Sequence, residues 1–462
     1  MAAEHRFQPL PAGSHGLDPG EVRTDQGRRL REAMIELIAE KGFPAVRISD
    51  LSRLAHVSPP TLYSLYADKE HLLLGTYEDV ARRASNAILG AHGEHEEHGD
   101  RLRGALEAFA ALASREPKAI SLLVLGAFGA GPAVLRKRRA ALDALEAYIH
   151  SNRSPGEPLD QGDLTVRAML GGVREITAMR LRNGRERELP ELAEPLRAWA
   201  GCYPPCLPAG LRAPDLSAAA QPEGAPSDGD ETALSERARR AEGRLPSGRH
   251  DLPREAIAKN QQERIVDATA EIVSEQGLGA LTIPAIAKRA NVSNQTFYSF
   301  YASKHDAFLG TQKVGMHQAL GVTAEAYGAH PEDWPRAVAA GLGALLGYLA
   351  SEPAHAHLTV VDTFAASPET IAIREDANAA FSSYLAPGFK LAAARGGGPT
   401  AAGEPPGELA AEAVVGGIWQ VLHDYVARGA AAALPGAAPQ LSYFALAPFI
   451  GAEDAAAAAL AR

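Results

Sequence analysis

An internal repeat limits how this chain can fold more than any other feature of its sequence. Residues 28–74 read RRLREAMIELIAEKGFPAVRISDLSRLAHVSPPTLYSLYADKEHLLL, and residues 263–309 read ERIVDATAEIVSEQGLGALTIPAIAKRANVSNQTFYSFYASKHDAFL. The segments align without a gap, about 235 residues apart, and about 17 of about 47 positions are identical. Helix-ending glycines are among the identities, since Gly42 aligns with Gly277. A module repeated with its turns intact predicts two domains with one fold and one kind of task.

Weaker similarity follows each copy, which indicates that a longer unit was duplicated. Gly171-Gly172 aligns with Gly416-Gly417, and Leu189-Pro190 aligns with Leu434-Pro435. Between the two units, about 50 residues rich in Pro, Gly, Ala, Ser and charge predict a flexible linker with an average span of roughly 40 Å.

Composition favours helices and an intracellular setting. Aromatic residues make up 6% of the chain, alanine is abundant and β-branched runs are short. The two cysteines, Cys202 and Cys206, provide no disulfide framework. The first residues lack the apolar core of a signal peptide, and no apolar run reaches the length of about 18 residues that crosses a bilayer. We therefore expect an all-α cytoplasmic protein without a membrane segment.

The formal net charge of −10 is unevenly distributed. The two repeats sum to about +1 and the rest of the chain to about −11. This distribution is compatible with nucleic-acid binding by the repeats. An acidic protein with two neutral surface modules would show the same pattern.

The first copy predicts three helices joined by short turns. Apolar residues recur at helical spacing over residues 28–41, and Gly42 ends this helix with a left-handed backbone. A second helix spans about residues 48–55, and residues 56–58 form the turn. Ser58 caps the third helix, which ends near Tyr66, before a fourth helix begins at Lys69.

The second copy repeats this plan with small changes. Gly277 ends the first helix, Thr282 caps the second, and residues 291–293 form the turn. Ser303 and Asp306 resemble a capping box at the start of the fourth helix.

A helix, a turn of three or four residues and a second helix form the unit that places its second helix in the DNA major groove. Any three-helix bundle contains such turns, so the outward residues matter. In the first copy we expect Leu62 and Tyr66 to face inward. Four residues should be available to solvent, namely Thr61, Tyr63, Ser64 and Lys69. Hydroxyl, phenol and ammonium groups beside a helix N-terminus suit phosphate oxygens.

Both copies resemble the DNA-binding head of the tetracycline-repressor (TetR) family. The segments VSPPTLYSLYADKEHLL and VSNQTFYSFYASKHDAFL fit that family's pattern, which is close to G-V-S-x-x-T-L/F-Y-x-Y/H-F-x-[ST/N]-K-E-x-L. The resemblance implies a homodimer, a helical ligand-binding domain behind each head, and ligand-induced release from a palindromic operator. The strong match covers the two heads, which are roughly a fifth of the chain.

The resemblance assigns the residues of each head to roles on DNA. Phosphate-contact positions are occupied by Thr61, Tyr63, Lys69, Thr296, Tyr298 and Lys304. Base-facing positions are occupied by Pro59, Pro60, Ser64, Asn294, Gln295 and Ser299. The cap positions Arg47, Ser58, Thr282 and Ser293 complete the expected DNA-binding set.

The two heads depart from the family pattern in different ways. Leu65 and Phe300 stand where the family usually has a tyrosine or histidine facing DNA, and Arg47 replaces a threonine cap. The turn glycine is replaced by His56 and Asn291, of which asparagine tolerates a left-handed backbone better.

The base-facing residues also differ between the heads. Pro59 and Pro60 offer no side-chain hydrogen bonds and suit thymine methyl groups, whereas Asn294 and Gln295 can bond adenine in bidentate fashion. We therefore expect a pseudo-palindromic operator with unlike arms.

The resemblance assigns dimer packing to the last two helices of each unit, here about residues 164–184 with 190–203 and 408–428 with 438–450. A single chain carries both halves, and tethering raises their effective concentration into the millimolar range. We favour an intramolecular pseudo-dimer, and a homodimer of two chains is the alternative.

The domain prediction follows from these segments. It comprises a disordered arm (1–22), a first helix-turn-helix head (23–74), a first helical regulatory domain (75–203), a flexible linker (204–253), a second head (254–309) and a second helical regulatory domain (310–462).

Other motifs point to no catalytic, metal or cofactor chemistry. His92, His95 and His98 lie in a polar, glycine-flanked stretch without a zinc-protease spacing. The cysteine pair lacks the C-x-x-C spacing, and the glycines at 341, 343 and 347 lie within a helical Ala-Leu segment rather than after a strand. We expect no enzyme activity, metal or cofactor.

The predicted function is a DNA-binding transcriptional regulator, most simply a repressor, that a small-molecule effector releases from a double-stranded operator. A ligand-independent structural or scaffold protein with two DNA-binding heads is the alternative. The sequence does not identify the effector. Its weak candidate contacts are aromatic or polar residues in apolar stretches, namely Phe128, Phe364, Trp419 and His423.

Overall fold

The computed structural model describes residues 7–8, 18–93, 98–125, 132–153, 162–214, 253–362, 368–394 and 407–461. These residues form helices, turns and connecting segments, and no strand occurs among them. The all-α prediction is therefore confirmed. Within the described ranges no single helix is long and apolar enough to cross a bilayer, and one pair of helices, bent by 106° at its break, passes by length and composition alone.

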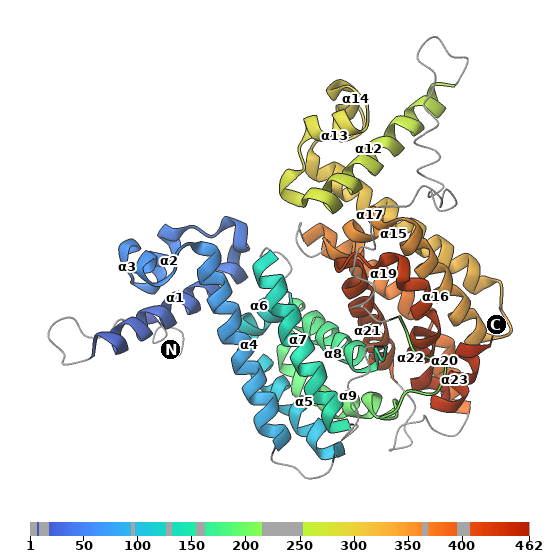
Figure 1. Cartoon of the computed structure of the whole chain (residues 1–462), viewed down its shortest axis with the longest axis horizontal. Helices are drawn as coiled ribbons and strands as arrows, with labels where there is room; N and C mark the ends of the chain where they lie inside the picture. Colours follow the sequence, from blue (N-terminus) through green and yellow to red (C-terminus); the bar gives the residue numbers. More distant parts are fainter. Residues whose placement is uncertain are drawn as a thin grey trace. The chain divides into compact units, whose positions relative to one another are not determined.

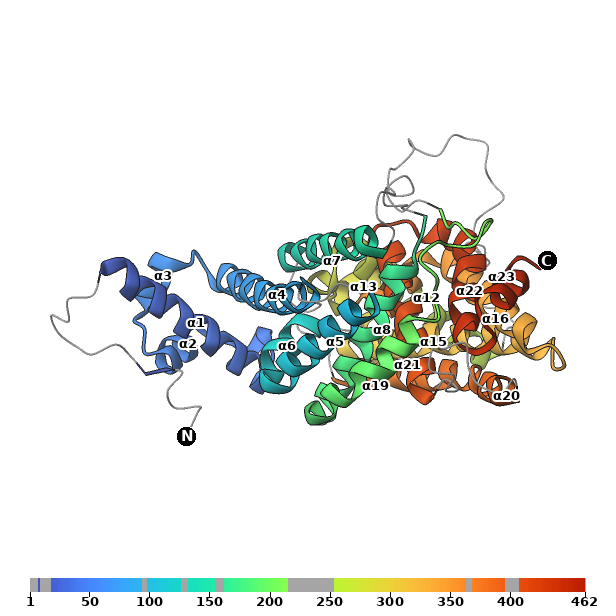
Figure 2. The same ribbon diagram turned by 90° about the horizontal axis from the view of Figure 1, so that it is seen from below.

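The chain divides into two compact units, shown in Figures 1 and 2. Unit 1 comprises residues 1–157 and 173–197, and unit 2 comprises residues 158–172 and 198–462. The division runs through one helix, α8 (Thr165–Arg182), whose first half belongs to unit 2.

Unit 1 contains the first head and the helices behind it. The head consists of α1 (Pro19–Lys41), the short 3₁₀ turn η2 (Phe43–Ala45), α2 (Ile48–Ala55) and α3 (Pro59–Leu65). The body consists of α4 (Lys69–Gly93), α5 (His98–Arg115), α6 (Pro117–Val124), α7 (Pro132–Arg153), the second half of α8, η4 (Glu186–Leu192) and most of α9 (Ala193–Ala200). One apolar core runs from the head into the body.

Unit 2 contains the second head and a second helical body. The head consists of α12 (Arg254–Gln276), η6 (Leu278–Ala280), α13 (Ile283–Arg289) and α14 (Asn294–Tyr298). The body consists of α15 (Lys304–Gly328), α16 (Trp334–Ser351), α17 (Pro353–Ala356), the π-helical turn η7 (His357–Val361), α19 (Pro368–Ser383), α20 (Ala386–Ala394), α21 (Glu408–Ala427), η8 (Ala431–Ala437), α22 (Ala438–Ile450) and α23 (Ala452–Leu460). Most residues of α21 and α22 are buried, so these two helices form the centre of this body.

The first helix begins earlier than the sequence predicts. We expected residues 1–22 to be a disordered arm, but α1 starts at Pro19. Asp18 and Glu21 form a reciprocal capping box, and Pro19 occupies the first helical position, where its missing N–H has no consequence. These local interactions extend a helix that apolar periodicity alone would start near residue 28.

The segment expected to be a flexible linker begins with an ordered stretch. Residues 204–214 pack on unit 2, where Leu211 is fully buried. The Ala213 N–H donates to the Gly162 carbonyl at 3.0 Å, and the Tyr425 hydroxyl donates to the Pro214 carbonyl at 2.7 Å. Composition predicted a linker because Pro and Gly dominate, but the buried Leu211 and these two hydrogen bonds anchor this part. Residues 215–252 lie outside the described residues.

Within unit 2, the first half of α8 packs on α21 through glycines. A Cβ placed on Gly172 would lie 2.6 Å from the Ala413 carbonyl oxygen, and one on Gly417 would lie 2.6 Å from the Ala168 carbonyl oxygen. Side chains cannot fit at these distances, so only glycine permits this approach. The ring of Tyr203 stacks on Phe444 beside this contact, with centroids 4.7 Å apart.

We expect the substitution Gly417→Ala to lower the free energy of unfolding by about 1–3 kcal/mol, because the added methyl group overpacks the contact. The matched control is Gly343→Ala in α16, where nothing lies within 4 Å of the added Cβ. The control should be neutral or stabilise by about 0.5–1 kcal/mol. Urea unfolding midpoints measure both, and equal changes would contradict the packing described above.

Candidate nucleic-acid interface and interior cavity

The turn of each helix-turn-helix uses a left-handed backbone at a residue other than glycine. His56 has φ of 50° and Asn291 has φ of 52°. Asparagine at this position was expected to be tolerated, and histidine adopts the same conformation. Gly42 and Gly277 close the preceding helices at φ of 73° and 78°, as predicted.

A buried arginine that the sequence analysis missed holds the first turn in place. The Arg29 guanidinium donates to the Ala55 carbonyl at 2.6 Å and to the His56 carbonyl at 3.1 Å, and Asp25 accepts from the same guanidinium at 2.8 Å. Hydrogen bonds from a charged donor are worth about 1.5–3 kcal/mol each. The corresponding Arg264 of the second head donates to the Asn291 carbonyl at 3.5 Å. Arg29 and Arg264 are identical at aligned positions of the repeat, and this identity could have indicated their shared role from the sequence.

Serine caps orient the third helix of each head. The Ser58 hydroxyl accepts from the Thr61 N–H at 3.3 Å, and the Ser293 hydroxyl accepts from the Thr296 N–H at 2.9 Å. The capping predictions are therefore confirmed for both helices. Each cap also ties down the threonine side chain, since the paired hydroxyl oxygens lie 2.8 Å and 2.9 Å apart in the two heads.

The other predicted caps divide as the sequence indicated. Thr282 accepts from the Ala285 N–H at 3.3 Å, whereas Arg47 makes no capping hydrogen bond. Ser303 caps α15, but the Asp306 carboxylate accepts from the Ala302 N–H rather than from the Ser303 N–H. The predicted capping box is therefore shifted by one residue.

The third helices present most of their polar residues outward, as predicted, whereas Thr61 and Thr296 are half-buried. The side chains of Tyr63 and Tyr298 are 54% and 59% exposed, while Leu62 and Phe297 are fully buried on the opposite face. All of the expected base-facing residues are exposed in both heads, namely Pro59, Pro60, Ser64, Asn294, Gln295 and Ser299. Exposure is what a groove-reading helix needs, and contact with DNA stays a prediction.

The two lysines bind back to their own heads. The Lys69 amine donates to the Val46 carbonyl at 3.2 Å and lies 4.4 Å from the centroid of the Phe43 ring. The Lys304 amine donates to the Leu281 carbonyl at 2.9 Å, which is the corresponding position. We expected Lys69 to be available to solvent, but its side chain is half-buried. An ammonium carries three donors, so part of its capacity remains for a phosphate.

Leu65 and Phe300, which replace a DNA-facing aromatic or histidine of the family pattern, are half-buried against the cores of their heads. These departures therefore extend the core.

Carboxylates engage some of the basic side chains of the heads. Lys41 donates to Asp50 at 2.5 Å, and this hydrogen bond lowers the pKa of the Asp50 carboxyl. In the second head Arg289 donates to Glu275 at 2.8 Å and lowers the pKa of that carboxyl. Lys41 and Arg289 are therefore already paired with carboxylates of their own heads.

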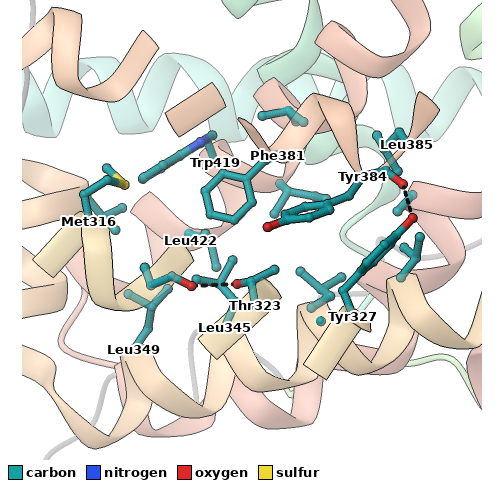
Figure 3. A pocket seen from close by; sticks show the side chains of 18 of the residues that line it. Met316, Thr323, Tyr327, Leu345, Leu349, Phe381, Tyr384, Leu385, Trp419 and Leu422 are labelled. Atoms are coloured by element: carbon teal, nitrogen blue, oxygen red, sulfur yellow. Dashed lines mark hydrogen bonds between the residues drawn. The ribbon is translucent and has the colours of Figure 1, made fainter. Parts of the chain in front are cut away.

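The body of unit 2 contains a cavity enclosed mainly by α15, α16, α19 and α21. It holds about 750 Å³ of empty space, part of it open to solvent. Figure 3 shows the Phe381 ring, the Trp419 ring and the Tyr384 hydroxyl directed into the same space. No charged side chain lines it; the lining residues are Met316, Ala319, Thr323, Tyr327, Val338, Gly341, Leu342, Leu345, Leu349, Thr359, Val360, Phe381, Tyr384, Leu385, Val415, Ile418, Trp419, Leu422 and Ala445.

Two of the polar groups at the cavity wall bond to the backbone. Tyr327 donates to the Tyr384 carbonyl at 3.2 Å, and Thr323 donates to the Ala319 carbonyl at 2.7 Å (Figure 3). Desolvation by burial raises the pKa of both the Tyr327 and the Tyr384 phenol, so both keep their protons at neutral pH. The Tyr384 hydroxyl has no hydrogen-bond partner among the described residues, so it can donate to a molecule in the cavity.

The candidate ligand residues from the sequence fall in different places. Trp419 lines the cavity. His423 does not; it lies buried beside Asp424, with 3.4 Å between its Nδ1 and a carboxylate oxygen. Phe128 and Phe364 lie outside the described residues. Sequence reasoning missed Tyr384 and Phe381, because apolar periodicity does not separate a cavity wall from a packed core.

A short route connects the cavity to the second head. Thr359 and Val360 of the π-helical turn η7 line the cavity, and α17 precedes this turn directly. In α17, the His355 Nε2 atom lies 3.1 Å from a carboxylate oxygen of Asp267 in the head helix α12. π-Helical turns in proteins often occur at functional sites. In unit 1, Lys118 of α6 forms the comparable contact with Glu36 of α1.

The weaker motifs supply no site within the described part of the chain. The side chains of His92, His95 and His98 lie outside it, and no group of three or more metal-ligating residues occurs within it. Cys202 is buried, which raises the pKa of its thiol to about 12, and Cys206 is exposed. Gly341 packs against Thr323 and Tyr327, in agreement with a role in helix packing, whereas a Cβ added at Gly343 or Gly347 would meet nothing within 4 Å.

Comparison with known proteins identifies both heads. The model of the family described as bacterial regulatory proteins, tetR family, matches residues 30–76 and again residues 265–309. No curated protein matches the chain.

Several solved structures are similar to parts of the chain. The fatty acid degradation regulator FadR from Bacillus halodurans is 16% identical over 38% of this chain and 94% of its own, with a TM-score of 0.35. FadR from Bacillus subtilis in complex with stearoyl-CoA is 17% identical over 37% and 96%, with a TM-score of 0.34. A TetR-like regulator from Rhodococcus sp. RHA1 is 20% identical over 39% and 96%, with a TM-score of 0.33.

We expect the substitution Ser293→Ala to destabilise the second head by about 0.5–2 kcal/mol, because it removes an N-cap. Hydrogen exchange at the Thr296 amide should accelerate accordingly. Ser299→Ala is the matched control, since that hydroxyl donates only to the Thr296 carbonyl in the last turn. Equal exchange rates in the two variants would show that the cap does not hold this helix.

Proposed function

The chain belongs to the tetR family of bacterial regulatory proteins as a tandem protein with two heads, and on this premise we propose that it is a repressor released from its operator by a neutral small molecule. It is a DNA-binding transcriptional regulator. The observation that carries the proposal is the pair of helices α3 and α14, each capped by serine, buried on one face and exposed on the other. We propose that it acts in the cytoplasm.

The residues at the start of these helices support an operator with unlike arms. Pro59 and Pro60 present only carbon atoms to a base, which suits a thymine methyl group. Asn294 and Gln295, both exposed, carry amides that can bond adenine N6 and N7. Each bidentate contact contributes about 1–3 kcal/mol of discrimination against the wrong base.

We further propose that the two repeats pair within one chain. The contacts between α8 and α21 support this, because they connect helices that occupy matching places in the two repeats. Half-sites must lie about 34 Å apart for two heads to enter successive major grooves. Intramolecular pairing would set that spacing without a second chain.

The cavity of unit 2 supports an effector that is neutral and mostly apolar. Its lining offers aliphatic and aromatic carbon and no charged side chain to balance a carboxylate or phosphate. An unpaired ion in such surroundings is strongly disfavoured. The Tyr384 hydroxyl supplies a donor for one oxygen atom of the ligand.

Release would follow from the connection between cavity and head. A ligand that pushes on Thr359 or Val360 would shift η7 and, through α17, the contact between His355 and Asp267. This changes the orientation of α12, and with it the reach of α14 into the groove. The ligand can displace the equilibrium only by the difference in its affinity for the two head positions.

Selection from a random DNA library should yield two half-sites that differ in sequence, with adenine preferred in one. Asn294→Ala with Gln295→Ala should remove the adenine preference in that arm alone, a loss of about 1–3 kcal/mol per contact. Pro59→Ala with Pro60→Ala is the matched control and should leave the adenine arm unchanged. Two identical arms in the wild-type selection would refute the proposal that the two heads recognise different half-sites.

Uncharged alcohols and ketones of moderate size should raise the melting temperature, and carboxylic acids with the same carbon skeletons should not. Tyr384→Phe should weaken binding of the alcohols by about 0.5–1.5 kcal/mol, because it removes one hydrogen bond. Tyr298→Phe, on the exposed face of the head, serves as the control and should not alter ligand binding.

The same ligands should lower operator affinity in a DNA-binding titration. If they stabilise the protein and leave operator affinity unchanged, the alternative of a ligand-independent tandem DNA-binding scaffold is favoured instead. If only the acids bind, the proposed effector class is wrong.

A further inference from the structure

The contact between α8 and α21 has nearly two-fold symmetry, because its two sides are formed by residues that correspond in the two repeats. With Gly171-Gly172 aligned on Gly416-Gly417, Ala168 corresponds to Ala413. Gly172 faces the Ala413 carbonyl, and Gly417 faces the Ala168 carbonyl, each at 2.6 Å from a Cβ placed on the glycine. This reciprocity is the signature of a two-fold interface, in which residue i meets j and j meets i.

The aromatic residues beside the glycines follow the same rule. Trp199 lies against Gly172, and Phe444 lies against Gly417. These two rings occupy corresponding places in the repeats and contact each other edge to face, with centroids 6.0 Å apart. All of these residues belong to unit 2. Two copies of the same repeat would form equivalent glycine and aromatic contacts, so packing alone does not determine which repeats associate.

Polar contacts break this symmetry, among them one buried ion pair and the hydrogen bond from Gln440 to Asp163. The Arg167 guanidinium pairs with the Asp424 carboxylate at 3.1 Å, and the two side chains are only 11% and 9% exposed. Gln420 donates to the other oxygen of the same carboxylate at 2.9 Å. In the repeat alignment Arg167 corresponds to Glu412, and Asp424 corresponds to Met179, so the partners have no mirrored copy.

We propose that the Arg167–Asp424 ion pair selects which repeats associate, an inference that rests on the proposed pairing of the two repeats within one chain. Two C-terminal repeats from different chains would bring Asp424 against Glu412, a buried pair of like charges, at both ends of the interface. Two N-terminal repeats would bury Arg167 against Met179 without a carboxylate. Only an N-terminal repeat with a C-terminal repeat joins opposite charges, and tethering makes the repeat of the same chain the favoured partner.

Analytical ultracentrifugation of the full chain over a micromolar concentration range tests this selection. The wild-type protein should sediment as one chain of 48.6 kDa. R167E should destabilise the pairing, and the charge-swapped R167E/D424R should recover part of the lost melting temperature, because it restores opposite charges but removes the acceptor for Gln420. R187E, which alters an exposed arginine of the N-terminal repeat, should match the wild type.

The decisive variant is R167E/E412R. It makes the original pairing repulsive and places the guanidinium introduced at position 412 against Asp424 of a second chain, so its mass should double with increasing concentration. The proposed selection is refuted if the mass of R167E/E412R stays at 48.6 kDa, or if the melting temperature of R167E/D424R is no higher than that of R167E. A wild-type protein of twice the chain mass would refute the intramolecular pairing itself. A monomeric wild type whose charge variants behave like it would refute only the proposed role of the Arg167–Asp424 ion pair in selecting the partner.

Discussion

The approach of α8 to α21 through glycine is the constraint on which the rest of unit 2 depends. Gly172 and Gly417 allow the backbone of each helix to approach a main-chain carbonyl of the other helix. This close approach fixes the distance between the two helices as well as their direction. The opposite face of α21 then carries Val415, Trp419 and Leu422 to the cavity. A single helix thus connects the glycine contact to the site that we assign to the effector.

The heads depend on a different kind of interaction, in which polar groups satisfy the backbone of the turn. Arg29 holds the carbonyls of the first turn, while Lys69 and Lys304 hold the loop before the second helix of each head. These bonds leave the outer face of α3 and α14 to short polar residues and the exposed tyrosines. The outward residues can therefore differ between the heads, as Pro59-Pro60 and Asn294-Gln295 do, without loss of the fold.

Local features were predictable because three or four consecutive residues encode them. The caps Ser58, Ser293 and Thr282 and the helix ends at Gly42 and Gly277 are confirmed. Errors occurred where a distant partner decides the outcome. The amine of Lys69 bonds a carbonyl from another turn, and Leu211 anchors a stretch that composition assigns to the linker.

The sequence by itself determined the number of units, their helical class and the residues that each head exposes, because repeats, periodicity and capping are properties of neighbouring residues. Only the tertiary structure decided which apolar residues enclose a cavity, since wall and core share one periodicity. It also decided that Arg167 meets Asp424, two residues far apart in the chain whose pairing follows from the crossing of α8 and α21. Contacts of that kind depend on how helices pack, and no local pattern records them.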